Sequence, residues 1–469
     1  MFAKLQRIHF VGIGGIGMSG IAEVLLNLGY KVSGSDLKHS PVTERLESLG
    51  AKVFEGHRAN NVEGAEVVVT SSAIDKRNPE VAEAHSKHIP VIQRAEMLAE
   101  LMRLKYGIAV AGMHGKTTTT SMVAAVLAGG ELDPTVIVGG RVDAMGSNAR
   151  LGKSHYLVAE ADESDRSFLK LSFIHAVVTN LDREHMDTYR DMADVENTFV
   201  EFMDRVPFYG MVVACNDDEM LRNILPRVQR RIVRYGTREG SDFLIRCSPC
   251  TAEQKNLGFF NNFSVQYRGK DLGEFQLRVP GIHNVRNATA AIAIGLGLDI
   301  ELEKIRTALA EFRGVDRRFQ LKGKAADVSV IDDYGHHPTE IRATLAAAKQ
   351  CGFRKIHVIF QPHRYTRTRD LLDDFASAFQ DADSLFLLDI YAASEEPIDG
   401  VHSEAVARRI TERTGRPVFY AKSFPTAALM AATAAEPGDM ILTLGAGNVS
   451  QLGPQILERL SAKKTVSTP

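Results

Sequence analysis

The segment Gly112–Thr120, which reads GMHGKTTTT, has the residue types needed to bind the phosphates of a nucleotide. It follows the apolar run Ile108–Ala111 and precedes Met122–Leu127, a run of helical character, so we expect a turn between a strand and a helix. In such a turn, glycines let backbone N–H groups converge on anionic oxygens at the positive end of the helix dipole. Lys116 would neutralise the β- and γ-phosphates, and the Thr117 hydroxyl would reach Mg²⁺.

This loop departs from the usual Gly-x4-Gly-Lys spacing, because Val110 stands where the first glycine would be. The Gly115-Lys116-Thr117 core is retained. The alternative interpretation is a strand–helix turn that contains Gly-Lys-Thr by chance.

A second glycine-rich segment, Gly12–Gly17 (GIGGIG), also follows an expected strand and opens an expected helix. Asp36 lies 19 residues after Gly17, at the end of the next expected strand. Taken literally, this is the dinucleotide-binding fingerprint with Asp36 on a ribose, and it predicts an NAD-dependent oxidoreductase. The spacing reports only a diphosphate at a helix N-terminus, however, and a nucleotide sugar such as a UDP-sugar has a diphosphate and a ribose as well. A purely structural turn is the third interpretation.

Acidic residues follow two expected strands of the unit that contains the phosphate loop. Glu160–Asp165 (EADESD) ends one strand, and Asn180–Asp187 (NLDREHMD) ends the next. Carboxylates at strand ends beside a phosphate loop are natural Mg²⁺ ligands, and His185 is a candidate for a second metal ligand. The alternatives are a solvated acidic turn in the first segment and a surface histidine in the second.

Strand-to-helix junctions with polar residues also occur in the last third of the chain, at Asp332–Pro338 (DDYGHHP), Gln361–Arg367 (QPHRYTR) and Gly445–Asn448 (GAGN). The carboxyl ends of parallel strands meet at one edge of a sheet, where ligands bind, so we expect the first two junctions to lie together. Arg364 and Arg367 could form a bidentate clamp on a carboxylate. A pair of surface salt bridges is the alternative.

Strands and helices alternate in a pattern that predicts an α/β protein of three domains, with limits at residues 1–105, 106–318 and 319–469. Within the central domain, Asp242–Pro280 has short alternating runs that favour antiparallel hairpins added to a parallel core. The expected strands are 8–11, 30–32, 51–54, 67–70, 90–92, 108–111, 156–159, 176–179, 211–214, 328–331, 356–360, 384–388, 418–420 and 440–444. The expected helices include 16–28, 287–298, 301–312, 339–349 and 371–379.

The composition argues against several classes of function. The 469 residues carry a formal net charge of −2, so no electrostatic attraction to nucleic acid or anionic lipid is indicated. No apolar run approaches the ~20 residues of a membrane span, and glycines interrupt the N-terminal apolar stretch, unlike a signal peptide. The chain has 4 cysteines, too few for a disulfide framework, which favours a reducing compartment. We interpret Cys247 and Cys250 as two ordinary thiols that flank a turn rather than as a zinc or redox site.

These motifs, in this order along nearly the whole chain, resemble the Mur ligase family, the ATP-dependent amide-bond ligases of peptidoglycan synthesis. The segments that carry the resemblance in the first part are GIGGIGMSGIA, SGSD, TSSAI and QRAEMLAEL. Those in the middle are GMHGKTTTT, EADESD, TNLDREHMDTY and PGIHNVRNATAA, and those in the last part are DRRFQ, DDYGHHPTEI, FQPHRYTRT and LGAGN. The resemblance implies a Rossmann-like UDP-binding N-terminal domain, a central P-loop ATPase domain and a Rossmann-like C-terminal domain that holds the amino acid.

The resemblance also implies which residues serve each substrate. The residues expected to face UDP-N-acetylmuramate are Gly14, Gly15, Ile16, Gly17, Asp36, Ser71, Ser72 and Arg94. Those expected to bind ATP are Gly112, Met113, His114, Gly115, Lys116, Thr117, Thr118, Asn284 and Asn287, with the asparagines on the adenine side. The residues that match positions holding L-alanine or steering the reacting carboxylate are Tyr334, His336, Arg364 and Arg367.

The resemblance assigns metal ligands and catalytic residues as well. Thr117 and Glu160 would hold one Mg²⁺ and His185 a second, with Mn²⁺ expected to be able to substitute. The expected catalytic residues are Lys116, His185, His336 and Arg364. The family usually has threonine where this chain has Met113, so we expect an altered nucleotide affinity with activity retained. We expect no carbamylated lysine near the second metal.

The activity implied by the resemblance is ATP-dependent ligation of L-alanine to the lactyl carboxylate of UDP-N-acetylmuramate through an acyl phosphate. The expected partners are ATP, L-alanine and UDP-N-acetylmuramate, and no nucleic acid or membrane is expected. We expect the protein to be cytoplasmic and to be a monomer or a weak homodimer. The alternatives are a recycling ligase that adds L-Ala-γ-D-Glu-meso-diaminopimelate to the same sugar, an NAD-dependent oxidoreductase and a non-enzymatic nucleotide switch. The recycling ligase typically has Phe-Ala where this chain has Tyr334-Gly335, which favours alanine.

Overall fold

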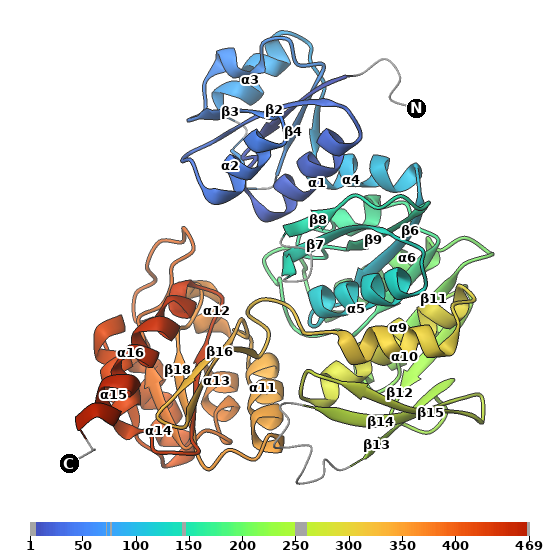
Figure 1. Ribbon diagram of the computed structural model, residues 1–469. Helices are drawn as coiled ribbons and strands as arrows, with labels where there is room; N and C mark the ends of the chain where they lie inside the picture. Colours follow the sequence, from blue (N-terminus) through green and yellow to red (C-terminus); the bar gives the residue numbers. More distant parts are fainter. Residues whose placement is uncertain (1–5, 72, 76, 143–146, 249–259, 467–469) are drawn as a thin grey trace. The chain divides into compact units, whose positions relative to one another are not determined.

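The computed structural model describes residues 6–71, 73–75, 77–142, 147–248 and 260–466. The chain forms two compact units. The first contains the described parts of Met1–Ser248 with Asn262–Gln276 and Arg286–Arg313, and the second contains those of Pro249–Asn261 with Leu277–Val285 and Gly314–Pro469. Three separate sheets are present (Figure 1), two in the first unit and one in the second, which confirms the three expected α/β parts. Domain limits at 1–105, 106–318 and 319–469 remain a proposal.

The first sheet has five parallel strands in the order β3-β2-β1-β4-β5. Its strands are β1 (Arg7–Val11), β2 (Lys31–Asp36), β3 (Lys52–Glu55), β4 (Val67–Thr70) and β5 (Val91–Gln93). The helices of this part are α1 (Ile16–Asn27), α2 (Pro41–Ser48), η1 (Ala59–Val62), α3 (Pro79–Ser86) and α4 (Arg94–Arg103). The strand order reverses between β1 and β4, so the segments that follow these strands lie at a switch point, where open α/β sheets bind ligands.

The second sheet has ten strands in the order β15-β14-β13-β12-β11-β10-β6-β9-β7-β8. Its strands are β6 (Tyr106–Ala111), β7 (Thr135–Val142), β8 (Ser147–Arg150), β9 (Tyr156–Glu160), β10 (His175–Val178), β11 (Met211–Cys215), β12 (Ile232–Gly236), β13 (Phe243–Ser248), β14 (Asn261–Tyr267) and β15 (Lys270–Leu277). The accompanying helices are α5 (Lys116–Gly129), η2 (Ser167–Lys170), α6 (Met192–Asp204), α7 (Glu219–Ile224), η3 (Leu225–Arg227), α9 (Ile282–Gly297) and α10 (Leu302–Glu311).

The parallel centre of this sheet is extended by antiparallel strands on both sides. The expected hairpin region is confirmed, because β13 pairs antiparallel with β14 and β15 lies next to β14. The antiparallel pair β7–β8 and the parallel strand β12 were not expected from the sequence. Gly139 and Gly140 within β7 interrupt the apolar pattern, and β8 (SNAR) is largely polar, so neither has a strong strand signal.

The third sheet has six strands in the order β16-β17-β21-β18-β19-β20. Its strands are β16 (Gln320–Ala325), β17 (Val328–Asp333), β18 (Ile356–Phe360), β19 (Ser384–Leu387), β20 (Val418–Tyr420) and β21 (Met440–Leu444). The helices are α11 (Pro338–Gln350), α12 (Tyr365–Asp370), α13 (Leu372–Ala378), α14 (Ser403–Thr414), α15 (Phe424–Ala434), η4 (Asn448–Gln451) and α16 (Leu452–Val466). All pairs are parallel except that of the edge strand β16 with β17, which contains a register shift between Leu321 and Gly323.

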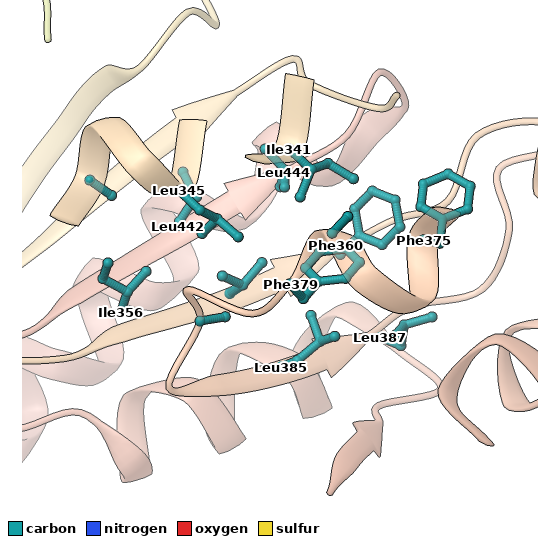
Figure 2. Packing of buried hydrophobic residues seen from close by; sticks show 14 of the residues in the cluster. Ile341, Leu345, Ile356, Phe360, Phe375, Phe379, Leu385, Leu387, Leu442 and Leu444 are labelled. Carbon is teal, nitrogen blue, oxygen red and sulfur yellow. The ribbon is translucent and has the colours of Figure 1, made fainter. Parts of the chain in front are cut away.

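Side chains of the third sheet alternate between two cores. Val358 and Phe360 of β18 belong to the cluster shown in Figure 2, which includes residues of α11, α13 and α14. Ile359, between them, joins the cluster with residues of α15 and α16 on the other face. Each fully buried side chain of this size contributes about 1.5–3 kcal/mol. Burial on both faces explains why the central strands read as continuous apolar runs.

Two expectations from the composition can be compared with the structure. Within the described residues, no helix combines the length and the apolar character needed to cross a bilayer. Cys247 is exposed and lies in β13. Cys250 lies outside the described residues, so the interpretation of this pair remains a prediction.

A buried carboxylate, Glu80 in the first turn of α3, connects the helix to the first sheet. Its Oε2 accepts a hydrogen bond from the Ser35 hydroxyl (2.6 Å), and its Oε1 accepts one from the Asn61 amide (2.5 Å). The Nε2 atom of His9, on β1, lies 3.5 Å from Oε2. Burial acts to raise the pKa of Glu80, but His9, Ser35 and Asn61 together outweigh it and lower the pKa to about 2.

We expect Glu80→Gln to destabilise the first sheet at pH 7 by up to about 3 kcal/mol, because a lowered pKa stabilises the folded state when the carboxylate is ionised. This contribution is complete above the ordinary pKa of 4.5 and is lost as the pH falls toward 2, so the penalty shrinks over that window. Hydrogen exchange of the β1 and β4 amides at several pH values measures it.

Glu83→Gln is the matched control for this prediction. Glu83 lies on the same helix but forms a surface pair with Lys87 (2.9 Å), so its loss is expected to cost less than about 1 kcal/mol. A penalty for Glu80→Gln that does not change with pH would contradict the electrostatic explanation.

Candidate active site

The glycine loop after β1 is held by hydrogen bonds to β2. Gly12 has φ +79° and donates its N–H to Ser35 O (2.8 Å). Gly14 N donates to Asp36 Oδ2 (2.8 Å), and a Cβ at position 14 would lie 2.9 Å from that oxygen. Gly15 precedes α1, and no side chain within the described residues caps this helix. The N–H groups at the start of α1 are therefore suited to an anion such as a diphosphate.

Asp36 has a positioning contact that the sequence did not reveal. Its carboxylate accepts the N–H groups of Gly14 and Leu37, both at 2.8 Å, so it fixes the shape of the glycine loop. A contact of Asp36 with a ribose remains a prediction. The turn that begins at Ser71, directly after β4, brings Ile74 to within 3.3 Å of a Cβ built on Gly12, so this turn borders the loop. Ser72 lies outside the described residues.

Arg94, the first residue of α4, lies beside the first turn of α1. A Cβ at Gly17 would come within 2.8 Å of the Arg94 Nη1 atom, so the lack of a side chain at position 17 permits this approach. The Nη2 atom of Arg94 donates to Asp162 Oδ2 (2.9 Å), in the acidic segment after β9. Arg94 thus connects the expected UDP-sugar loop with the expected metal-binding segment. Ile16 is the first residue of α1, as its assignment requires.

The expected strand–turn–helix layout of the phosphate loop is confirmed, because β6 ends at Ala111 and α5 begins at Lys116. Gly112 has φ +126°, and a Cβ there would collide with Thr179 Oγ1. Thr179 Oγ1 donates to His114 O (2.6 Å), and Asn180 Nδ2 donates to the same carbonyl (2.9 Å). The segment directly after β10 therefore holds the loop in a fixed shape.

The side chains of the loop have different surroundings. His114 Nε2 lies 2.8 Å from Asp182 Oδ2, so this histidine is anchored to the segment after β10. The Met113 side chain is buried, and its carbonyl accepts a hydrogen bond from Lys116 Nζ (3.1 Å). Thr118, in the first turn of α5, is also buried. The expected effect of Met113 on nucleotide affinity remains a prediction.

Lys116 Nζ donates to Gly112 O (2.8 Å), Met113 O (3.1 Å) and Glu163 Oε1 (2.8 Å). Burial lowers the pKa of Lys116, but Glu163 and Glu160 outweigh it and raise the pKa above its ordinary value, so the ammonium stays protonated. Burial raises the pKa of Glu163 to about 7 even though Lys116 opposes this. Both pKa values are raised, although an ion pair alone would lower that of Glu163. Several carboxylates stabilise the ammonium of Lys116, whereas Lys116 is the main group that opposes the effects of burial and of Asp162 on Glu163. The ionised form of Glu163 therefore depends on Lys116.

Oxygen atoms suited to a divalent cation lie at the start of α5. Thr117 Oγ1 donates to Glu160 Oε2 (3.0 Å), so two of the expected metal ligands meet. His185 has φ +56°, and its Nε2 lies 3.6 Å from Glu163 Oε1. Glu163 Oε2 is buried and has no hydrogen-bond partner within the described residues. Carboxylate and hydroxyl oxygens are the ligands that Mg²⁺ prefers, so the residues present fit this ion.

The two asparagines of α9 lie in its first turns, because this helix begins at Ile282, earlier than the sequence indicated. A Cβ at Gly115 would lie 3.1 Å from Asn287 Oδ1, which places Asn287 against the phosphate loop. Asn284 Nδ2 donates to Pro280 O (2.7 Å), so its amide is bonded at the start of its own helix. Their role toward an adenine remains a prediction.

In the second unit, the junctions Asp332–Pro338 and Gln361–Arg367 lie at one edge of the third sheet, as expected, and Gly445–Asn448 lies there as well. The strands that precede them, β17, β21 and β18, are adjacent and parallel. Arg317 ties two of the junctions together, because its Nη2 donates to Gly445 O (2.6 Å) and its Nε donates to Asp332 Oδ2 (3.2 Å). Its guanidinium also lies 4.9 Å from the centre of the Tyr334 ring.

A row of four rings runs along this edge. Tyr334 meets His336 edge-on (5.4 Å between centroids), His336 lies 5.6 Å from His363, and His363 stacks on Tyr391 (5.5 Å). Burial, together with His336 and nearby arginines, lowers the pKa of His363 to about 3, so it stays neutral. Arg367 Nη1 lies 3.3 Å from its Nδ1 atom.

Arg364 and Arg367 lie at the start of the same short helix, α12, and the expected clamp remains a prediction. Arg364 has φ +69° and precedes α12, and its N–H donates to Tyr391 O (2.8 Å). Its Nη1 lies 3.9 Å from Glu395 Oε1, and that carboxylate also accepts from the Thr366 hydroxyl (2.7 Å). The segment after β19 therefore holds the start of α12.

Sequence reasoning missed the specific roles of Glu163, Asp182, Arg317, His363 and Glu395. Two of these, Glu163 and Asp182, lie within acidic segments that were singled out, but spacing does not say which carboxylate faces a lysine or a histidine. Arg317 and Glu395 act from segments remote in sequence. Their partners depend on the order of strands in the sheet.

Sequence profiles of Mur ligases match three consecutive parts of the chain. The profile described as "Mur ligase family, catalytic domain" matches residues 7–106, "Mur ligase middle domain" matches 110–295, and "Mur ligase, glutamate ligase domain" matches 317–447. Together these matches extend over most of the chain.

Similar proteins over the full length are UDP-N-acetylmuramate–L-alanine ligases. That of Koribacter versatilis is 87% identical over 467 residues, which are 100% of both chains. That of Acidobacterium capsulatum is 65% identical over 464 residues, which are 99% of each chain. The crystal structure of the UDP-N-acetylmuramate–alanine ligase MurC from Thermotoga maritima has a TM-score of 0.80 at 30% identity and covers 97% of this chain and 99% of that chain.

We expect Gly112→Ala to weaken binding of MgADP by about tenfold or more, because a Cβ collides with Thr179 Oγ1 and displaces the loop. Gly240→Ala is the matched control, since Gly240 also has positive φ (+85°) but has nothing within 4 Å of its Cβ position. Isothermal titration calorimetry measures both affinities. Equal affinities for the two variants would contradict the role given to the loop shape.

Proposed function

Because the chain belongs to the Mur ligase family, we propose that it joins L-alanine to the lactyl carboxylate of UDP-N-acetylmuramate, with conversion of ATP to ADP and phosphate, in the synthesis of peptidoglycan precursors. The observation that carries the proposal is the 87% sequence identity, over the full length, with the UDP-N-acetylmuramate–L-alanine ligase of Koribacter versatilis. Three features support the proposal: the phosphate loop, the N-terminus of α1, which no side chain of the described residues caps, and the arginine-rich edge of the third sheet.

The reaction needs activation, because the oxygen of a carboxylate is a poor leaving group. A lactyl carboxylate oxygen attacks the γ-phosphorus of ATP, so a C–O–P linkage forms and ADP leaves. The amine of L-alanine then attacks the carbonyl carbon, the C–N bond forms, and phosphate departs with the oxygen that linked it. The amine loses its proton in this step. The products are an amide, ADP and phosphate.

Each group of side chains has a task in this scheme. Lys116 and the N–H groups at the start of α5 would hold the phosphates and offset their repulsion of the carboxylate. Thr117, Glu160 and His185 would hold Mg²⁺, which supplies charge neutralisation at the transferred phosphoryl group. Arg364 and Arg367 would bind the carboxylate of L-alanine in bidentate fashion, and Tyr334 and His336 would border its amine.

The finer features of the proposal follow the same reasoning. At the UDP-sugar, Gly14–Gly17 would receive the diphosphate at the N-terminus of α1, with Asp36, Ser71, Ser72 and Arg94 around it. We further propose two Mg²⁺ ions, replaceable by Mn²⁺, and a cytoplasmic monomer or weak homodimer. A recycling ligase differs from the proposed enzyme in its acceptor, which is a tripeptide in place of L-alanine.

The test is phosphate release with MgATP and UDP-N-acetylmuramate, with L-alanine in one reaction and L-Ala-γ-D-Glu-meso-diaminopimelate in the other. Release is expected only with L-alanine. Lys116→Ala is expected to reduce turnover by about a thousandfold or more while binding of the UDP-sugar stays intact, because the hydrogen bonds of this lysine are to the phosphate loop and to Glu163. Release that requires the tripeptide would make the protein a recycling ligase instead.

Lys153→Ala is the matched control for this assay. Lys153 is an exposed lysine of the same sheet region, and its loss is expected to leave turnover unchanged. Turnover retained by Lys116→Ala would contradict the proposed use of the phosphate loop.

A further inference from the structure

We propose that Glu163 makes this enzyme selective for metal-bound over metal-free nucleotide. When the phosphates bind Lys116, Glu163 loses its hydrogen bond to this lysine, and the cation bound with the nucleotide compensates for the loss. The inference rests on the proposed function only in that the loop binds ATP. It assigns to Glu163 a positioning role that the expected ligand set, Thr117, Glu160 and His185, does not include.

The first step of the argument is the number of donors on Lys116. An ammonium group has three N–H donors. All three are engaged, by Gly112 O (2.8 Å), Met113 O (3.1 Å) and Glu163 Oε1 (2.8 Å). A phosphate oxygen can therefore bind Lys116 only if it replaces one of these acceptors. Glu163 is the one acceptor that lies outside the loop.

The second step is that Glu163 cannot move away when it loses Lys116. Its side chain is 1% exposed. Its carbonyl accepts hydrogen bonds from the Tyr189 hydroxyl (2.6 Å) and from Arg166 N (3.1 Å), which fix the backbone there. Its Oε2 already has no hydrogen-bond partner within the described residues. After exchange, the buried carboxylate loses its main counter-charge, so it must take up a proton or gain another cation, and either costs binding energy when the nucleotide is metal-free.

The third step is the charge that each form of the nucleotide brings. Metal-free nucleotide adds only anions next to Glu163, so the carboxylate and the phosphates compete for one ammonium. A divalent cation bound with the nucleotide at Thr117 and Glu160 reduces the negative charge around Glu163. Metal-bound nucleotide therefore meets a smaller penalty than metal-free nucleotide, and the difference depends on the charge at position 163.

The test compares ADP affinity in EDTA with ADP affinity in excess Mg²⁺, measured by calorimetry without the other substrates. Glu163→Gln is expected to tighten binding of metal-free ADP by roughly tenfold and to reduce the gain in affinity that Mg²⁺ gives. A merely structural role predicts the opposite sign, because a damaged site binds nucleotide more weakly. Weaker or unchanged binding of metal-free ADP by a folded variant would overturn the inference.

Two further variants complete the experiment. Glu163→Asp keeps the charge and is expected to retain the Mg²⁺ dependence of the wild type. Glu219→Gln removes a charge from the exposed first turn of α7, after β11 of the same sheet, and is expected to leave both affinities unchanged. If Glu163→Gln does not fold, loss of the Mg²⁺ dependence in Glu163→Asp overturns the inference and its retention supports it. Absence of MgADP binding in the wild type would instead contradict the proposed function, and the inference with it.

Discussion

A protonated lysine held in a rigid glycine loop is the interaction on which the proposed chemistry of this protein depends. Lys116 is bonded to two loop carbonyls and to Glu163, and the surrounding carboxylates keep it charged despite its burial. The loop keeps its shape because Gly112 leaves room for Thr179 and because Asn180 bonds the His114 carbonyl. In the proposed complex, the phosphates of ATP would meet a lysine that is already charged and held by the loop.

The three sheets follow one topological rule. In each, the chemically capable residues follow the carboxyl ends of parallel strands: after β1 and β4 in the first sheet, after β6, β9 and β10 in the second, and after β17, β18 and β21 in the third. Adjacent parallel strands bring such segments together even when they are far apart in sequence. Arg317 shows the result, since it bonds Asp332 and the carbonyl of Gly445.

The sequence predicts most of the architecture because its strong signals are local. Apolar runs that end in glycine or polar residues gave the parallel strands, and the glycine loops before Ile16 and Lys116 marked the helices that follow. Strands with a weak sequence signal were not predicted: β7 contains two glycines, β8 is largely polar, and β16 is an edge strand. The start of α9 at Ile282 was also placed too late, because its first turn carries polar residues.

The candidate site is predictable in residue type but not in pairing. The sequence indicated that Lys116, Thr117 and Glu160 belong together, and Thr117 does meet Glu160. That Glu163 rather than its acidic neighbours pairs with Lys116 depends on the turn after β9. That Asp36 bonds the glycine loop depends on the register of β1 and β2. Such pairings follow from three-dimensional geometry, which the spacing of motifs does not contain.

The most direct test of the proposed chemistry is to follow oxygen from the substrate into the phosphate. UDP-N-acetylmuramate labelled with ¹⁸O in its lactyl carboxylate is allowed to react with MgATP and L-alanine, and the mass of the released phosphate is measured. Activation through an acyl phosphate predicts one labelled oxygen in each phosphate, because the oxygen bonded to phosphorus leaves with it. Phosphate without label would show that the carboxylate is not phosphorylated and would contradict the central role given to the phosphate loop.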